Sequence, residues 1–167
     1  RDLNPLSPFK FFSSGVRVQG NRYVTRQEIL ENLDLWKVES IFDFSIEPRR
    51  NKLEEIAWIQ EAYLVRLLPN RLGVLIKERQ PVAFVQVADR VKLMDSEGVV
   101  LDVPSGSSFD FPVLTGWNES TVEGDRGAHL LLYEGFIRSW EDVSQGEWSV
   151  SEVDVSDLKD LRAVLVG

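Results

Sequence analysis

The stretch from residue 62 to residue 77 reads AYLVRLLPNRLGVLIK, two apolar runs on either side of the pair Pro69-Asn70. Successive side chains of a strand point to opposite faces, so each run can bury one face in a core. Pro69 suits the first position of a tight turn, and Asn70 tolerates a positive φ at the second. The stretch predicts a β-hairpin, and any fold of this chain must place that hairpin in a sheet.

The residues before the hairpin predict a strand and a helix. Val16-Arg17-Val18 alternates like a short strand, and Gly20-Asn21 ends it with a turn. Thr25 followed by Glu28 is typical of a capping box, in which the hydroxyl accepts from the third helical amide. Apolar residues at helical spacing then predict a helix over 26–34.

A second helix is predicted over 49–58, RRNKLEEIAW, with arginines in its first turn that oppose the helix dipole. Trp58 at its end is expected to anchor the core, because a module of about 70 residues needs large buried side chains. The order strand, helix, helix, strand, strand predicts an α+β module: a three-stranded sheet with two helices on one face, placed in residues 9–80.

Beyond Pro81 the pattern changes to short alternating strands around one amphipathic helix. This half, residues 81–167, is predicted to be a mostly antiparallel β domain with one helix. The predicted strands are 82–87, 91–95, 99–103, 148–156 and 161–167, the helix is 128–143, and 104–112 is expected to be a loop.

Charge separates the two halves. The net charge of the chain is −8, yet residues 91–167 hold 5 basic and 15 acidic side chains, a balance of 5 − 15 = −10. An acidic surface argues against nucleic acid as a partner, since phosphate binding needs a basic face. The pattern equally fits an acidic surface that only aids solubility.

The chain offers little chemistry for catalysis. It has no Cys and a single His, His129, which near a helix start is interpreted as a surface residue. No phosphate-binding loop, nucleophile elbow or zinc-protease motif occurs, and no acidic pair stands in a recognisable motif. We therefore expect no enzyme activity, no cofactor, no metal and no small-molecule substrate.

Several motifs in one order carry a family resemblance. The chain resembles the POTRA domain and following β domain of the FtsQ/DivIB family of bacterial cell-division proteins, over roughly residues 12–116. The matching strings are VRVQGN (16–21), TRQEI (25–29), EAYLVRLLPNRL (61–72), ERQPVA (78–83), MDSEGVVL (94–101) and FPVLTG (111–116).

The resemblance implies a non-catalytic scaffold of the division machinery that joins septal membrane proteins during septum formation. It implies a single-pass inner-membrane protein whose anchoring helix is absent from this chain, with residues 9–167 on the periplasmic, extracytoplasmic side of the septum. Implied partners are FtsL-like and FtsB/DivIC-like single-span proteins, and FtsW/FtsI-type synthases. The alternative is a POTRA module of an outer-membrane assembly or secretion system, distinguished by several POTRA repeats before a barrel.

Partner-binding residues are expected where a strand edge is free. The strand over 61–68 is expected at an edge of the POTRA sheet, able to accept a further strand. The candidates for partner contact are Tyr63, Val65, Arg66, Leu67, Arg79 and Arg138. The competing interpretations are a protected edge, cross-strand ion pairs of the arginines with Glu61 and Glu78, and a solvated helical charge ladder from Glu134 through Arg138 to Asp142.

The last strand raises a separate expectation. In the family, the strand over 161–166 continues into further β-structure that carries the main docking edge, so the β domain is expected to be C-terminally incomplete here. This chain is therefore expected to bind FtsL/FtsB-like partners weakly or not at all, and to keep the edge around Tyr63–Leu67 for other division proteins.

Overall fold

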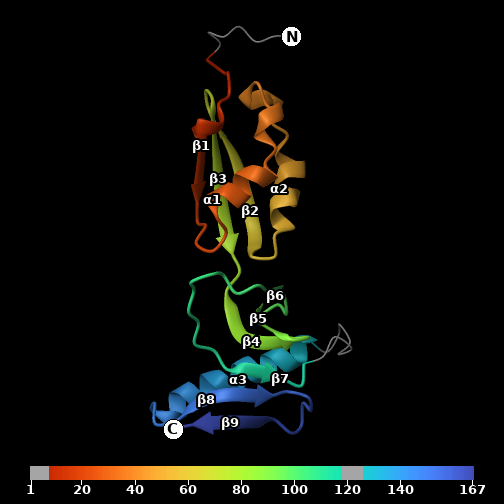
Figure 1. Cartoon of the computed structure of the whole chain (residues 1–167), viewed down its shortest axis with the longest axis vertical. Helices are drawn as coiled ribbons and strands as arrows, with labels where there is room; N and C mark the ends of the chain where they lie inside the picture. The colour runs from red at the N-terminus through yellow and green to blue at the C-terminus, as the bar shows by residue number, and fades with distance from the viewer. Residues whose placement is uncertain (1–7, 118–125) are drawn as a thin grey trace. The chain divides into compact units, whose positions relative to one another are not determined.

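The computed structural model describes residues 8–117 and 126–167. The chain divides into two compact units, Arg1–Arg79 and Gln80–Gly167, and each is described by itself. The predicted α+β class is confirmed: the first unit holds a three-stranded sheet with helices, and the second holds a six-stranded sheet with one helix (Figure 1).

The first unit has the predicted order of elements. Its strand order is β1-β3-β2, with β1 parallel to β3 and β2 antiparallel to it. The elements are η1 Ser13–Gly15, β1 Val16–Gln19, α1 Arg26–Asn32, η2 Leu35–Lys37, η3 Ile41–Asp43, α2 Ile46–Glu54, β2 Ile59–Leu67 and β3 Arg71–Glu78, where η marks a short 3-10 helix.

One face of this sheet forms the core. Leu64 of β2 and Val74 of β3 are paired and buried, and the helices contribute the buried Ile29 and Leu53. Trp58 is buried as predicted, with its ring centroid 4.8 Å from that of Tyr23. The alternation along the hairpin therefore decides which face of the sheet the helices cover.

The predicted bounds of the second helix are wrong. Helix α2 begins at Ile46 and ends at Glu54, so the expected start at residue 49 is three residues late. Pro48 lies in the first turn, where proline is tolerated because its position needs no helical N–H partner. Glu47 also lies in that turn and suits the positive end of the helix dipole, so the arginines do not begin the helix.

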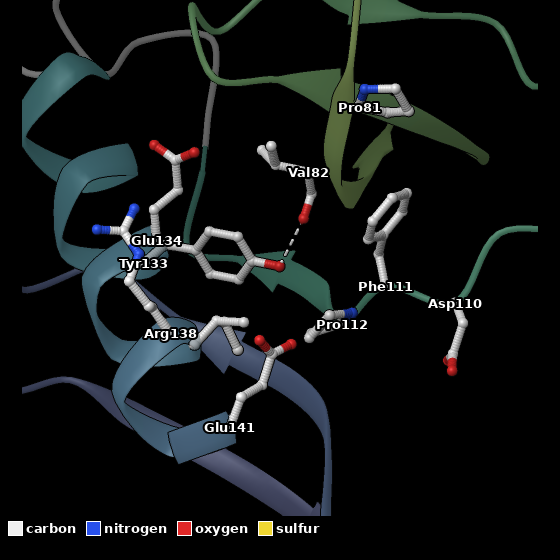
Figure 2. A pocket seen from close by; sticks show the side chains of 10 residues that line it. Pro81, Val82, Asp110, Phe111, Pro112, Tyr133, Glu134, Arg138 and Glu141 are labelled. Atoms are coloured by element: carbon white, nitrogen blue, oxygen red, sulfur yellow. Dashed lines mark hydrogen bonds between the residues drawn. The ribbon is translucent and has the colours of Figure 1, made fainter.

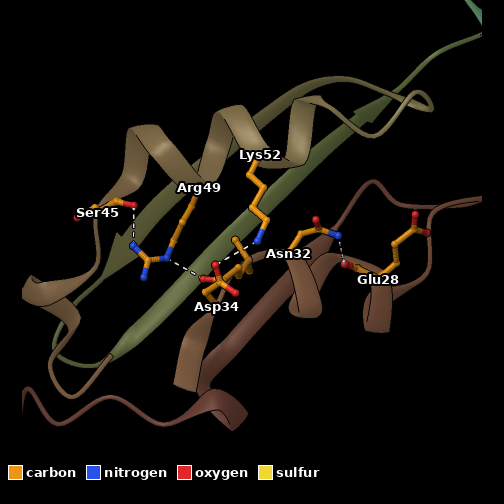
Figure 3. A network of polar contacts seen from close by, with 7 residues as sticks. Glu28, Asn32, Asp34, Ser45, Arg49 and Lys52 are labelled. Atoms are coloured by element: carbon orange, nitrogen blue, oxygen red, sulfur yellow. Dashed lines mark hydrogen bonds and ion pairs between the residues drawn. The ribbon is translucent and has the colours of Figure 1, made fainter. Parts of the chain in front are cut away.

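Polar contacts join α2 to the end of α1 (Figure 3). Arg49 Nε donates to the carbonyl oxygen of Leu33 over 2.7 Å. Lys52 Nζ lies 3.1 Å from a carboxylate oxygen of Asp34, and this hydrogen bond holds the pKa of Asp34 below its ordinary value. Asp34 itself has a positive φ of 50°, so the chain reverses there between the two helices.

The hairpin is confirmed, but its predicted turn is wrong. Leu67 pairs with Arg71, which leaves three residues in the turn. The Leu68–Pro69 peptide is cis, and Asn70 does not take the positive φ that it was expected to tolerate.

The predicted turn after β1 is present. Gly20 has a φ of +83°, and a Cβ there would lie 2.1 Å from the carbonyl oxygen of Ile76.

The second unit is a mixed sheet of order β6-β5-β4-β7-β8-β9, in which three of the five pairings are antiparallel, in line with the prediction of a mostly antiparallel sheet. The elements are β4 Pro81–Val87, β5 Arg90–Asp95, β6 Val100–Leu101, β7 Val113–Thr115, α3 Arg126–Ser144, β8 Ser149–Asp154 and β9 Arg162–Val166. The core lies between the sheet and α3, where Leu130 and Tyr133 pack against Val85, Leu114 and Val153.

Two features of this unit escaped sequence analysis. Strand β7 was not predicted, although it occupies the centre of the sheet between β4 and β8. His129 was predicted at the surface and is instead buried, with Nδ1 2.5 Å from the carbonyl oxygen of Val155. Helix α3 begins at residue 126, so His129 lies in its first turns on the face that packs on the end of β8.

Candidate partner-binding surfaces

Strand β2 lies at an edge of the three-stranded sheet, as predicted. Tyr63, Val65 and Leu67 are exposed on the face away from the helices, and Leu75 of β3 pairs with Tyr63 and is also exposed. Three of the six predicted partner-binding residues therefore share one apolar surface. We call Tyr63, Val65, Leu67 and Leu75 the β2 face.

The backbone of β2 offers a partly protected edge. The N–H of Ala62 donates to a carboxylate oxygen of Glu54 on α2 over 3.0 Å, so this amide points away from β3. Because amides alternate along an antiparallel strand, the N–H groups of Leu64 and Arg66 point to the same side. A strand added at this edge would meet two amides beyond the one that Glu54 occupies.

Arg66 does not join the β2 face. Its guanidinium donates to the carbonyl oxygens of Ile41 over 3.1 Å and Phe44 over 2.6 Å. Both contacts lie in the segment that leads into α2, so the side chain supports the unit itself. Sequence analysis missed this role because residues 41–44 carry no signal that they return to the hairpin.

Glu61 and Glu78, the carboxylates offered as ion-pair partners for Arg66 and Arg79, make other contacts. Glu61 contacts Lys77 across the strands at 3.5 Å and accepts from the Tyr63 hydroxyl over 2.8 Å, and this hydroxyl bond lowers the pKa of Glu61. Glu78 is buried and accepts from three backbone amides, those of Arg22, Tyr23 and Val24. Arg79 Nε donates to the carbonyl oxygen of Ala57 over 3.1 Å.

Arg138 lies in the second unit, beside a hollow along α3 of about 300 Å³ (Figure 2). The predicted ladder is not formed: in residues 8–117 and 126–167 no ion pair joins Arg138 to Glu134 or Asp142. The hollow is lined by Pro81, Val82, Asp110, Phe111, Pro112, Tyr133, Glu134, Ile137, Arg138 and Glu141.

The floor of this hollow is fixed by Tyr133. Its hydroxyl donates to the carbonyl oxygen of Val82 over 2.8 Å, and burial raises the pKa of the hydroxyl well above its ordinary value. A second hollow of about 270 Å³ extends to Trp148 and shares four lining residues with the first: Asp110, Pro112, Ile137 and Glu141. Sequence analysis missed this surface because the loop 104–112 shows no periodicity that places it under α3.

Strand β9 is a further edge strand of the described residues. It ends the six-stranded sheet, and all five of its side chains are exposed. The hydroxyls of Ser149 and Ser151 donate to the carbonyl oxygens of Val166 and Val164, each over 3.2 Å, so β8 holds β9 through side chains as well as backbone.

Within residues 8–117 and 126–167, no cluster of three or more His, Asp or Glu side chains is placed to hold a metal ion. Across the same ranges, no helix has both the length and the hydropathy of a membrane span.

A β-α-α-β-β unit with an exposed edge strand defines a protein of the POTRA class, and residues 13–79 match the family description "POTRA domain, FtsQ-type". The chain belongs to the FtsQ/DivIB family. It is 33% identical over 156 residues to the cell division protein FtsQ of Koribacter versatilis, covering 92% of this chain and 45% of that protein. It is 31% identical over 144 residues to FtsQ of Syntrophotalea carbinolica, covering 86% and 50%.

A third relative extends the likeness to DivIB. The cell division protein DivIB of Clostridium acetobutylicum is 26% identical over 88 residues, covering 53% of this chain and 35% of that protein. The chain thus spans about half the length, or less, of the curated relatives it matches.

Proposed function

We propose that this chain is the extracytoplasmic part of a non-catalytic scaffold that gathers membrane proteins at the division septum. Membership of a family whose relatives carry the name cell division protein supports the cell-division role. The proposed location is the periplasmic side of the inner membrane, with the anchor outside these residues.

The observation that carries the scaffold role is the β2 face beside an open strand edge. Exposed apolar side chains at Tyr63, Val65 and Leu67 adjoin the amides of Leu64 and Arg66, which point away from β3. Strand addition uses such amides for affinity and alternate side chains for specificity. A division protein with an extended segment is the partner that this geometry fits.

A pull-down tests this role. The bait is the chain, and the prey are extracytoplasmic segments of FtsL-like, FtsB/DivIC-like and FtsI-type proteins. The triple variant Tyr63→Ala, Val65→Ala, Leu67→Ala is expected to lose at least one prey protein. The matched control changes Leu131 and Val143, exposed residues of α3, to Ala. If the triple variant captured every prey protein as well as the parent does, the β2 face would not be the partner-binding surface.

For FtsL/FtsB-like proteins, we propose that docking needs β-structure beyond β9. A second pull-down compares this chain with a version extended past Gly167, and stronger capture by the longer chain is expected. Equal capture by both would place the docking surface within the 167 residues, contrary to this proposal.

The residues Arg79 and Arg138 remain proposed partner contacts. Arg138 is exposed at the rim of the α3 hollow. Because removing an exposed cation leaves packing unchanged, Arg138→Ala should weaken capture of an acidic partner without lowering the unfolding temperature.

A further inference from the structure

We propose that one end of the first unit rests on an anionic lipid bilayer surface. This end, called here the turn end, consists of residues 9–12, 40–44 and 66–71. It shares Leu67 with the β2 face, and the proposal does not rest on the partner role above.

Three segments far apart in sequence meet at the turn end. Lys10 bridges to Ser40, and the rings of Phe9 and Phe42 lie 5.1 Å apart. Arg66 donates to the carbonyl oxygens of Ile41 and Phe44, which ties the hairpin to this segment. Figure 1 shows the β2–β3 turn and the segment before β1 at the same end of the unit, and a Cβ on Gly15 would lie 3.1 Å from the carbonyl oxygen of Asn70.

Large apolar side chains at this end face solvent. Phe12 is 54% exposed, Phe42 is 57% exposed and Leu68 is 63% exposed. Each stands on a turn or short segment instead of a flat strand face. Protruding apolar tips of this kind suit a fluid interface that deforms around them, whereas a rigid protein partner would need a matching set of pockets.

Cations accompany these apolar tips. Lys10 Nζ lies 5.7 Å from the ring centroid of Phe12, and the turn end also holds Arg66 and Arg71. Its acidic residue is Asp43, whose carboxylate already accepts from the backbone amide of Ser40 over 3.1 Å. Glu39 is exposed and lies next to this end, where its carbonyl oxygen accepts from the amide of Phe11 over 2.9 Å. The three cations Lys10, Arg66 and Arg71 therefore outnumber the carboxylates of Asp43 and Glu39, and this excess complements an anionic surface.

The short helix η2, which leads into this end, repeats the pattern. Trp36 is 80% exposed, and Lys37 Nζ lies 4.5 Å from its ring centroid. Aromatic rings with lysine beside them are the side chains enriched where proteins meet lipid headgroups. The exposed apolar side chains and the cations beside them therefore both indicate that the turn end contacts an anionic bilayer.

Flotation with lipid vesicles tests the proposal. The chain is mixed with vesicles of phosphatidylcholine alone or of phosphatidylcholine with phosphatidylglycerol, at low and at high salt. Binding to the anionic vesicles is expected, with weaker binding to phosphatidylcholine alone and at high salt, because salt screens the cations. No flotation with anionic vesicles at low salt would overturn the proposal.

Variants locate the contact. Phe12→Ser, Phe42→Ser and Leu68→Ser together should weaken vesicle binding about tenfold or more, since insertion of these side chains drives binding. Lys10→Gln and Arg71→Gln should each weaken it about fivefold. The control Leu131→Ser with Val143→Ser removes α3 side chains that are 72% and 77% exposed and should bind like the parent.

Two results would contradict this assignment. One is vesicle binding that the triple variant retains in full. The other is self-association of the lipid-free chain that the triple variant abolishes in sedimentation velocity, because the turn end would then be covered by a second copy. Circular dichroism of each variant checks that the fold is intact, as expected for exposed positions.

Discussion

The buried carboxylate of Glu78 accepts a hydrogen bond from the backbone amide of Val24 over 2.8 Å, which joins the end of β3 to the turn before α1. The same carboxylate accepts from the amides of Arg22 and Tyr23. The backbone amides of the turn before the first helix thus find their acceptor in a side chain 54 residues further along the chain.

Replacing Glu78 by Gln should destabilise the first unit by about 2–3 kcal/mol, because a charged acceptor becomes neutral and one oxygen becomes a donor facing buried amides. Urea unfolding followed by amide NMR signals of β3 measures this effect. The control Glu61→Gln alters a carboxylate in a surface pair that solvent screens, so it should cost much less than Glu78→Gln. Equal costs for the two variants would contradict the role of Glu78.

Gly116 and Gly106 have the same backbone conformation but different surroundings, so alanine substitutions at the two positions can be compared. Both have a φ of +73°, but a Cβ on Gly116 would lie 2.4 Å from Asp154 Oδ1, whereas nothing lies within 4 Å of one on Gly106. Gly106→Ala should cost about 1 kcal/mol for the left-handed conformation. Gly116→Ala should cost about 2–5 kcal/mol, since overpacking is added. The backbone nitrogen of Ser156 would lie 2.6 Å from the same Cβ, so a shift of the Asp154 side chain alone does not relieve the clash. Thermal unfolding of both variants checks the difference, and equal costs would contradict this account.

Tyr133 should make the second unit sensitive to alkali. Burial raises the pKa of its hydroxyl, so the folded state keeps a proton that the unfolded state releases above about pH 10. The unfolded state then binds fewer protons, and the free energy of unfolding falls as the pH rises above that value.

The variant Tyr133→Phe should cost about 0.5–1.5 kcal/mol at neutral pH, because the hydrogen bond to Val82 is lost. The same variant should lose stability less steeply than the parent above about pH 10. Urea titrations at neutral and alkaline pH measure both effects. A parallel decline of parent and variant would show that Tyr133 does not cause the alkaline loss.

We expect Arg66 to stabilise the first unit and not to bind a partner. Arg66→Ala leaves the carbonyl oxygens of Ile41 and Phe44 without their donor and should destabilise the first unit by about 1–3 kcal/mol. Arg66→Lys should restore only part of this, since an ammonium lacks the planar fork that reaches both oxygens. Arg17→Ala, at an exposed position of β1, is the control for loss of a cation. An Arg66→Ala variant as stable as this control would return Arg66 to the partner-contact candidates.

Local patterns determined much of the fold. The alternation of residues 62–77 sets which side chains of the hairpin are buried, and Thr25 accepts from the amide of Glu28 as its spacing predicts. The order of elements follows from such signals because strand and helix periods depend only on near neighbours. The edge position of β2 came from the family resemblance, and the structure confirms it.

The tertiary structure alone decided the roles that depend on contacts far along the chain. Glu78 meets the turn at residues 22–24, Arg66 meets residues 41–44, and His129 meets Val155, although local sequence makes each an ordinary surface residue. The three residues of β7 become a central strand because β4 and β8 supply partners on both sides. Sequence fixes which groups can form hydrogen bonds, and folding decides which distant groups they meet, because burial forces each polar group to find a partner.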